Sequence, residues 1–546
     1  MTIAKIFLAA AVAGLLAAGA ARAQPQQSTS HDCANARNLV VYNGKIHTLD
    51  ARDTIVKSVA IRDGRFIAGS DPGPCTRRID AGGRTVIPGL VDNHLHFLLW
   101  SLRPGHDVRL DGTTSLAEVQ QRLKARAAEV KPGAWITAIG GWVALQWKEN
   151  RFPTKAELDA ALPAHPALLY LAMSGPAVTN SLGQAYLAAH GVTVGDDGTI
   201  AANAPSFAAL AALRALQSFD DQQEGVLHAM AEEARFGVTS VFDASCFARP
   251  GSADLEDAVA VDGASSCDPF DVATPLAAVH DAGKMTLRVR LFFQSNDTRK
   301  DLPLLHRRLL NNIDRLGDDM LRIAGVGERV TTWLGQGGLP TPDDYAAALK
   351  LVASRGWSLR QHSLSLAEDQ FAVTGFEAAN AVTPIAALHW SIEHVPQIDA
   401  ATLARVKALG VGVALHGRYI STAGGPPYRM ILDSGIAAGA GTDAGQISTV
   451  DPWLIIYYMV TGKNAAGTLL NPGQQTTRAE ALRLFTARNG WFVRDEKFGA
   501  IRPGNYGDLV VLDADFLDPK KVPDEQIKKL AAALTIVDGK IVYRAR

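Results

Sequence analysis

The sequence predicts an α/β fold: a (β/α)8 TIM-like barrel with a small β-sandwich domain built from both chain ends and an insertion after the first barrel strand. Three observations lead to this prediction. In the middle of the chain, strand-like runs alternate with helical stretches rich in Ala, Leu, Glu and Arg. Hairpin-rich segments lie at both ends of the chain. Several of the central strand-like runs end in histidine or aspartate.

Eight strand-like runs are spaced as barrel strands would be, within a predicted barrel domain of residues 86–498. Alternation with helices is typical of parallel strands joined by helical crossovers, and eight such units close a barrel. The predicted strands cover residues 91–96, 239–244, 288–293, 321–328, 359–362, 391–394, 412–415 and 437–443.

Residues 100–225 separate the first two predicted strands and are too long for one crossover. They contain strand-like runs of their own, so we interpret them as an insertion. Because barrel enzymes place their active sites at the C-terminal ends of the strands, an insertion at this point is expected to act as a lid and specificity element.

The two ends of the chain share a sequence pattern that differs from that of the middle. Segments 38–85 and 499–546 contain short alternating strands around Asn43-Gly44, Asp63-Gly64 and Asp538-Gly539. These dipeptides are strong signals of tight hairpins. We therefore expect the two segments to pair into one composite β-sandwich that brackets the barrel.

The first 23 residues have the pattern of a secretory signal peptide. A single lysine, Lys5, precedes an apolar run, and Ala21-Arg22-Ala23 forms a cleavage site before Gln24. An uncleaved membrane anchor is the alternative, but the apolar run is short for a span. The sequence thus predicts a periplasmic or secreted protein, with residues 24–37 as a flexible, Gln/Ser-rich N-terminus.

The composition points to small-molecule chemistry. The net charge is −1 and no block of lysine or arginine stands out. This balance argues against nucleic acid as a partner and, after cleavage of the signal, against a membrane surface. The expected partner is a small amide-like substrate; a homo-oligomer remains open.

Four cysteines lie beyond the signal: Cys33, Cys75, Cys246 and Cys267. An oxidising compartment permits disulfides, and the local pairings are Cys33–Cys75 and Cys246–Cys267. Thiolate metal ligands are the alternative, although none of the four has C-x-x-C spacing. We favour two disulfides, with a connectivity that spacing alone does not fix.

The candidate metal ligands sit at the ends of predicted strands. His94 and His96 follow one another at i and i+2, so in an extended strand both imidazoles point to the same face. An isolated pair of this kind can equally be two core histidines. Other strand ends favour the interpretation as metal ligands. The fourth, fifth, sixth and eighth predicted strands end in Glu328, His362, His394 and Asp443.

Imidazole and carboxylate are ligands that Zn²⁺ prefers, so we expect one or two divalent ions at this rim. With two ions, Glu328 would supply the bridging anion. Its alternative is a surface glutamate that begins the next loop.

The chain resembles the amidohydrolase superfamily of metal-dependent hydrolases, and within it amidohydrolase family 3, the YtcJ-like and N-substituted formamide deformylase-like proteins. The resemblance is carried by segments that span nearly the whole chain after the signal: PGLVDNHLHFLLWSL, GGWVALQWKENRFPTKAELDAALPAHPALL, NSLGQAYLAAHGV, PPYRMILDSGIAAGAGTDAG and GAIRPGNYGDLVVLDAD.

Two departures from these relatives matter. Ser174-Gly175-Pro176 stands where they commonly have a Gly-His pair, which removes a polar substrate contact. After the fourth strand, where many have a lysine, this chain reads Gly325-Val326-Gly327-Glu328. Glu328 is therefore expected to replace a carboxylated lysine as the bridge.

The chemistry that follows is hydrolysis of an amide or N-acyl C–N bond. A divalent ion lowers the pKa of bound water from about 15.7 towards 7 and can polarise a carbonyl. Asp443 is expected to take the proton from that water and pass it to the leaving group, a role that the resemblance also implies. As further substrate contacts we expect Trp100, Trp142, His416 and Arg429.

Two alternatives use the same residues. The same site could hydrolyse an ester, a lactone or a cyclic amide, because pocket shape selects the carbonyl. A non-catalytic metal- or ligand-binding protein is the alternative from another class, and an Asp443→Asn substitution would leave such a protein unaffected.

Overall fold

The structure is a computed structural model that describes residues 33, 36–172, 174–244, 259–261, 264–266, 272–295, 300–310, 315–331, 341–445 and 447–545. The predicted signal peptide and nearly all of the predicted flexible N-terminus lie outside these residues. So do Cys246 and Cys267, so their pairing stays a prediction.

All eight predicted barrel strands are present and pair in parallel. They form two four-stranded sheets, in the orders β16-β15-β12-β6 and β17-β18-β19-β20. The bounds of the first sheet are β6 (Leu90–Leu95), β12 (Val238–Asp243), β15 (Arg288–Phe293) and β16 (Leu321–Val326). Those of the second are β17 (Arg360–Ser363), β18 (Ser391–His394), β19 (Gly412–His416) and β20 (Ala438–Gly441).

The two parallel sheets approach each other at both edges. A parallel bridge joins Val326 to Leu359, next to the edge strands β16 and β17. At the other side, the amide of Asp443 donates to the carbonyl of His94 at 2.8 Å. In the described residues the continuous ladders stop at these edges, so a single closed eight-stranded sheet stays a prediction.

Glycines permit the close approach of β20 to β6. A Cβ added to Gly441 would lie 2.4 Å from the backbone nitrogen of His94, and one on Gly439 would lie 2.3 Å from Asn93 Nδ2, and both of these residues belong to β6. A side chain at either position would therefore force the strands apart. The Gly-Ala-Gly run thus brings Thr442 and Asp443 next to His94.

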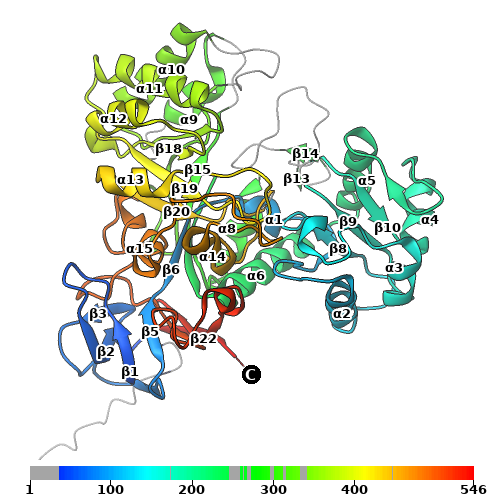
Figure 1. Ribbon diagram of the computed structural model, residues 1–546, viewed down its shortest axis with the longest axis horizontal. Helices are drawn as coiled ribbons and strands as arrows, with labels where there is room; N and C mark the ends of the chain where they lie inside the picture. The colour runs from blue at the N-terminus through cyan, green and yellow to red at the C-terminus, as the bar shows by residue number, and fades with distance from the viewer. Residues whose placement is uncertain are drawn as a thin grey trace, which may run out of the picture.

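Helices follow the parallel strands in sequence and pack against them (Figure 1). The largest apolar cluster contains side chains from both parallel sheets and from the helices that cover them. These helices are α1 (Phe97–Ser101), α6 (Phe219–Phe236), α8 (Thr274–Asp281), α9 (Pro303–Leu310), α10 (Pro342–Ser354), α11 (Leu366–Asn380), α12 (Ala400–Ala408), α13 (Tyr428–Ser434), α14 (Pro452–Thr461) and α15 (Arg478–Leu484).

Both chain ends contribute to one further sheet of eight strands. Its order is β23-β22-β21-β5-β1-β2-β3, with β4 paired to β1. The strands are β1 (Leu39–His47), β2 (Ile55–Arg62), β3 (Arg65–Ile67), β4 (Arg77–Asp80), β5 (Thr85–Pro88), β21 (Leu509–Leu512), β22 (Ala532–Val537) and β23 (Lys540–Arg544). This terminal sheet, β1–β5 with β21–β23, has its own apolar cluster. The described strands pair as one sheet, so the two-layered sandwich stays a prediction.

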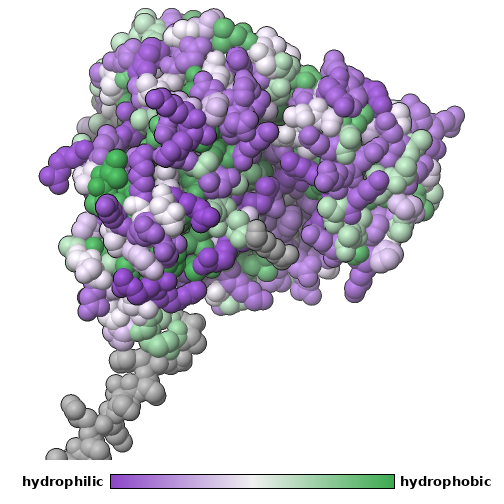
Figure 2. Space-filling view, turned by 60° about the horizontal axis from the view of Figure 1, so that its bottom comes forward, coloured by the Kyte–Doolittle hydropathy of each residue, from purple (hydrophilic) through white to green (hydrophobic). Residues whose placement is uncertain are grey.

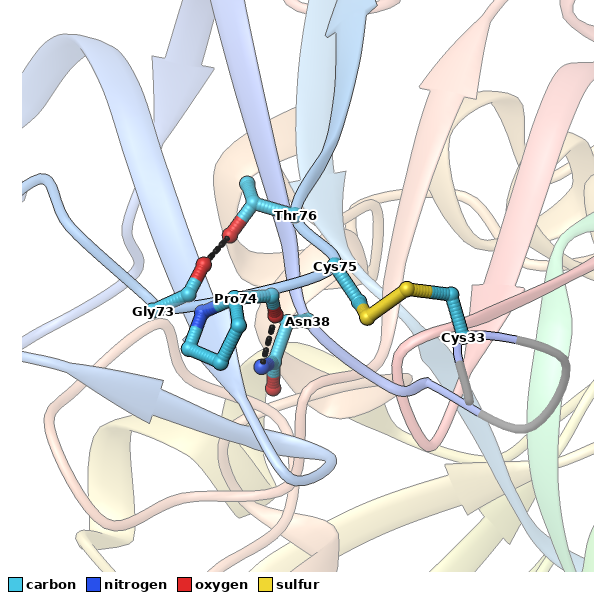
Figure 3. The surroundings of a disulfide bond; sticks show 6 residues. All are labelled: Cys33, Asn38, Gly73, Pro74, Cys75 and Thr76. Atoms are coloured by element: carbon cyan, nitrogen blue, oxygen red, sulfur yellow. Dashed lines mark hydrogen bonds between the residues drawn. A yellow bond between two sulfur atoms is a disulfide. The ribbon is translucent and has the colours of Figure 1, made fainter. Parts of the chain in front are cut away.

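A disulfide ties the start of the terminal sheet together. Cys33, before β1, is bonded to Cys75, before β4, with the two Cα atoms 5.3 Å apart (Figure 3). Beside the bond, the side-chain amide of Asn38 donates to the carbonyl of Pro74 at 3.0 Å. The first of the two predicted pairings is therefore present in the structure.

Residues 100–225 protrude to one side of the molecule (Figure 1). They build a five-stranded sheet, with the order β11-β10-β9-β8-β7, and two apolar clusters of their own. The elements are β7 (His106–Asp107), β8 (Ile136–Ile139), β9 (Ala167–Tyr170), β10 (Ala177–Thr179), β11 (Thr199–Ile200), α2 (Leu116–Ala127), α3 (Lys155–Ala161), α4 (Ser181–Ala189) and α5 (Ala204–Arg214). Figure 2 shows that hydrophilic side chains cover most of the visible face of this insertion, at the right.

Among the residues that the structure describes, no helix combines the length and the apolar character that crossing a bilayer requires.

Candidate metal centre

Seven side chains from six strand ends meet at one buried point between the two parallel sheets. They are His94, His96, Glu328, His362, His394, His416 and Asp443. Their donor atoms form three overlapping groups, each with all atoms within 4.8 Å of one another: His94/His394/His416, His94/His96/Glu328 and Glu328/His362/His394. All six predicted ligands therefore lie at this centre.

Glu328 lies at the middle of the centre. Its Oε1 is 2.9 Å from His362 Nδ1, 2.9 Å from His394 Nε2 and 3.2 Å from His94 Nε2. The side chain is 0% exposed, so the alternative of a surface glutamate is wrong. One buried carboxylate oxygen in contact with three imidazoles brings together donor atoms that could bind a cation, and the bridging role of Glu328 stays a prediction.

Asp443 approaches the centre from the opposite sheet edge. Its Oδ1 is 3.6 Å from His94 Nε2 and 3.5 Å from His96 Nε2, and its Oδ2 is 3.6 Å from His394 Nδ1. The backbone of Asp443 has a φ of +58° and that of His394 a φ of +69°. Non-glycine residues rarely adopt this conformation, and such strain concentrates at functional sites.

His416 belongs to the centre rather than only to a substrate pocket. It is the last residue of β19, and its Nδ1 lies 2.6 Å from His394 Nδ1. The sequence predicted it as a substrate contact because the seventh strand was expected to end at Leu415. The strand runs one residue further, which brings His416 level with the other strand-end ligands.

Glu393 is a functional residue that the sequence analysis missed. Its Oε2 lies 2.9 Å from His94 Nδ1, and its Oε1 accepts from Ser391 Oγ at 2.5 Å. A carboxylate behind a histidine fixes the orientation and tautomer of the ring. The available signal was its position directly before His394: alternation along β18 points it to the opposite face, towards the interior between the sheets.

The electrostatics of the centre favour the ionised form of both its carboxylates, Glu328 and Asp443. Burial alone would raise the pKa of Glu328, but electrostatic interaction with His362 and His94 and the hydrogen bonds of the imidazoles hold it well below its ordinary value. For Asp443, burial again acts upward, while His394 and His94 lower the pKa well below the usual range.

Two of the imidazoles are held neutral. Burial, followed by the charge of His394, lowers the pKa of His362 to about 4, even though Glu328 acts in the opposite direction. Burial together with His394 and His94 lowers the pKa of His416 well below its ordinary value. Neutral imidazoles retain lone pairs that can bind a cation.

The residues present fit a divalent metal ion. Among the residues that the structure describes, Glu328 Oε2 and His416 Nε2 are buried without a hydrogen-bond partner. Facing nitrogens also lie close together, with His394 Nε2 3.0 Å from His362 Nδ1. Unpartnered buried acceptors are costly, and a cation among them would satisfy them. Imidazole and carboxylate are the donor types that suit zinc and related ions.

A cavity of about 260 Å³ opens beside this centre. The insertion provides part of its wall through Trp142, whose ring stacks on Trp147 at 5.2 Å. The lining residues are Trp142, Val143, Leu171, Ala172, Leu364, His394, His416, Gly417, Arg418, Ile420, Ser421, Asp443, Ile447 and Ser448. The insertion thus meets the centre, as a lid would.

Two predicted substrate contacts lie elsewhere. Arg429 is on α13, where its guanidinium pairs with Glu480 at 2.9 Å and Asp433 at 2.9 Å, and it does not line the cavity. Its charge is already neutralised there.

Trp100 is buried in α1 and lines a separate cavity of about 410 Å³ at the base of the insertion. Sequence could not show which way these two helices face.

Solved structures of metal-dependent hydrolases share this fold. An uncharacterized metal-dependent hydrolase from Pyrococcus horikoshii OT3 matches with a TM-score of 0.59 at 18% identity, covering 88% of this chain and 98% of that one. Atrazine chlorohydrolase TrzN from Arthrobacter aurescens TC1, complexed with zinc, matches with a TM-score of 0.54 at 14% identity, covering 93% and 95%. The chain therefore shares the fold of these solved structures, and its histidine–carboxylate centre has the donor types that a metal-dependent hydrolase uses.

Within that class, the sequence comparisons give the family. The family model described as "Amidohydrolase family" matches residues 77–543, and the chain belongs to this family. N-substituted formamide deformylase of Arthrobacter pascens is 24% identical over 93% of this chain and 98% of its own length. Putative amidohydrolase YtcJ of Bacillus subtilis (strain 168) is 23% identical over 86% and 91%. The protein is accordingly a metal-dependent hydrolase that acts on carbon–nitrogen bonds.

Proposed function

We propose that this protein is an exported, zinc-dependent hydrolase that cleaves the C–N bond of a small amide or N-acyl compound. The observation that carries the proposal is the contact of one buried carboxylate oxygen, Glu328 Oε1, with three imidazoles from different strands. A purely structural cluster has no need of so many donors around one anion. A hydrolytic metal centre does.

The residues that would hold the metal are His94, His96, Glu328, His362, His394 and Asp443, with His416 as a further candidate ligand. A divalent ion bound there would supply a water molecule of lowered pKa and polarise a substrate carbonyl. Glu393 fixes the ring of His94 from behind, so that its Nε2 faces Glu328 and Asp443.

Asp443 is the residue proposed to move the proton. It lines the cavity, and its pKa is held low by the imidazoles, so the carboxylate is ionised and ready to accept. In the reaction, the water oxygen bonds to the carbonyl carbon while Asp443 accepts the water proton. The C–N bond then breaks, and the same proton passes to the departing nitrogen.

The insertion is proposed to control access. Trp142, Val143 and Leu171 bring apolar surface to the cavity that contains Asp443. Excluding water from this cavity would strengthen the electrostatic interactions inside it and favour compact substrates.

The two parallel sheets are proposed to be the halves of one barrel, with residues 100–225 as its lid. Export is proposed from the N-terminal pattern Lys5, apolar run and Ala21-Arg22-Ala23. The Cys33–Cys75 disulfide supports it, because disulfides persist in oxidising compartments such as the periplasm.

A hydrolysis screen tests the proposal. Zinc-loaded protein, with metal counted per chain, would be offered N-acyl amino acids, formamides, anilides and lactones. We expect amide hydrolysis in proportion to metal content. Hydrolysis of lactones alone would replace the amide assignment by an esterase, and a metal-loaded protein inert towards all four classes would refute the enzyme assignment.

A further inference from the structure

Arg418 is the cationic side chain in the wall of the cavity beside the metal centre. It lies two residues beyond His416, in the turn that follows β19. The turn is fixed by a hydrogen bond from the amide of Ser421 to the carbonyl of Arg418 at 3.1 Å. Arg418 therefore lines the same cavity as His394, His416 and Asp443.

The guanidinium of Arg418 has no structural partner among the described residues. In the described part of the chain, no hydrogen bond, ion pair or ring contact involves its side chain, which is partly buried. Other arginines of the barrel region are committed: Arg288 pairs with Asp508, and Arg360 donates to Asn93. A partly buried cation with no internal anion is the arrangement that binds a ligand's anion.

The remaining wall sets the shape of that ligand. Half of the lining residues have apolar side chains, and Ser421 and Ser448 contribute hydroxyls. Asp443 is the single acidic residue among the described lining residues, and it belongs to the metal centre. A cavity of about 260 Å³ is smaller than the roughly 300–1,000 Å³ typical of drug-sized ligands. The ligand is accordingly compact, apolar over much of its surface, and negatively charged at one point.

We propose that Arg418 binds the carboxylate of the substrate and that the substrate class is the N-acylated amino acids with a small apolar side chain. This inference rests on the proposed amide hydrolysis. The guanidinium offers two parallel N–H donors to a carboxylate, a geometry that fixes orientation as well as charge. With the carboxylate held at Arg418, the amide carbonyl of a compact substrate would lie in the same cavity as His394, His416 and Asp443.

The test compares a substrate that carries a carboxylate with its neutral amide analogue. N-acetylleucine and N-acetylleucinamide, each as the racemate, differ by the carboxylate alone, and acetate release measures cleavage of the same bond in both. Arg418→Met should lower kcat/KM for N-acetylleucine on the order of 100-fold, the value of a charge-assisted pair of hydrogen bonds. For N-acetylleucinamide the change should stay within about threefold.

Three variants make the test specific. Arg355→Met removes an equal charge from an exposed position after α10 and should alter neither substrate. Arg418→Lys keeps the charge but loses the planar fork, so its activity on N-acetylleucine should fall between wild type and Arg418→Met. Thermal unfolding of each variant reports whether the fold is kept.

A binding measurement separates this inference from the proposed function. In an Asp443→Asn background, calorimetry should show that Arg418→Met weakens N-acetylleucine binding at least tenfold and leaves N-acetylleucinamide unchanged. An equal loss for both ligands, or none for the anion, would overturn the role of Arg418. If the wild type binds the anion through Arg418 yet hydrolyses neither compound, the anion contact stands and the amide hydrolysis fails.

Discussion

Two buried clusters of charged side chains differ in how their charges are matched. At the junction between the parallel sheets and the terminal sheet, Arg288 meets Asp508 in a two-pronged pair of 2.7 and 2.9 Å. At the metal centre, five imidazoles and two carboxylates crowd together, and buried atoms such as Glu328 Oε2 have no hydrogen-bond partner among the described residues.

The difference lies in what completes each cluster. Burial alone would lower the pKa of Arg288, but Asp508 and Asp538 raise it above its ordinary value, so this pair is complete within the chain. At the metal centre, ring nitrogens of different histidines face one another, and in the described part of the chain Glu328 Oε2 and His416 Nε2 are buried without a hydrogen-bond partner. The first cluster therefore stabilises the fold, whereas the second needs a bound cation. The predictions below separate these two roles.

Asp443→Asn should have the largest effect. Removing the proton acceptor should lower kcat by about 10²- to 10⁴-fold, the usual contribution of a positioned acid–base group. Bound metal should remain, because six other donors are left. Steady-state kinetics with metal analysis measures both, and Asp281→Asn, at an exposed site on α8, is the matched control. Retention of more than half of the wild-type kcat would exclude Asp443 as the proton carrier.

Arg288→Met should act on stability and leave the centre intact. It strands the buried Asp508 carboxylate, which typically costs about 3–5 kcal/mol of unfolding free energy. Denaturant unfolding measures the loss, and kcat of the folded protein should not change. The double variant Arg288→Met/Asp508→Leu should recover most of the stability, because it removes both charges. A loss below about 1 kcal/mol in the single variant would show that the junction pair is not structural.

Glu393→Gln should lower the affinity for the metal, although Glu393 is not one of the proposed ligands. The substitution keeps the shape of the side chain but removes the charge that orients His94 through its Nδ1. Loss of such an orienting group typically reduces metal affinity about 10- to 100-fold. Competition with a chelator measures the affinity, and Glu377→Gln, a partner of Arg405 on the surface, is the control. Unchanged affinity would mean that His94 is oriented by other contacts.

Glu480→Gln should have the smallest effect, and only at neutral pH. Hydrogen bonds from Arg429 lower the pKa of Glu480 to about 2, from an ordinary value of 4.5. The folded state thus favours the ionised form, so the contribution is present above about pH 4.5 and is lost as the pH falls towards 2. Because the pair is partly exposed, we expect about 0.5–1 kcal/mol. Unfolding at pH 6 and at pH 2.5 measures it, and a difference that persists at the lower pH would contradict the assignment.

Much of the fold was predictable because its signals are local. The strands of the two parallel sheets alternate with helical stretches along the chain, and the Asn-Gly and Asp-Gly turns mark the strands of the terminal sheet. The pairing of the two chain ends was expected because both ends contain short alternating strands and tight-turn dipeptides. Closure of the barrel and a second sandwich layer depend on contacts between distant strands, which periodicity does not encode.

The candidate site was predictable for the same reason, up to a limit. Parallel strands end at one rim, so residues that close successive strands must converge, and this brought together His94, His362, His394 and Asp443. Glu393 was missed because its role depends on which face of β18 it occupies. Arg429 was misplaced because α13 turns it towards Glu480, and that rotation is a property of tertiary packing.

The most direct test of the central claim is the metal content of the chain. Wild type and Glu328→Gln would be loaded with Zn²⁺, passed through gel filtration and assayed for metal per chain. Wild type should retain at least one ion per chain, and the isosteric loss of the central carboxylate charge should reduce that content by at least half. A wild-type chain that retains no metal, or a Glu328→Gln chain that retains as much as the wild type, would contradict a metal centre built around Glu328.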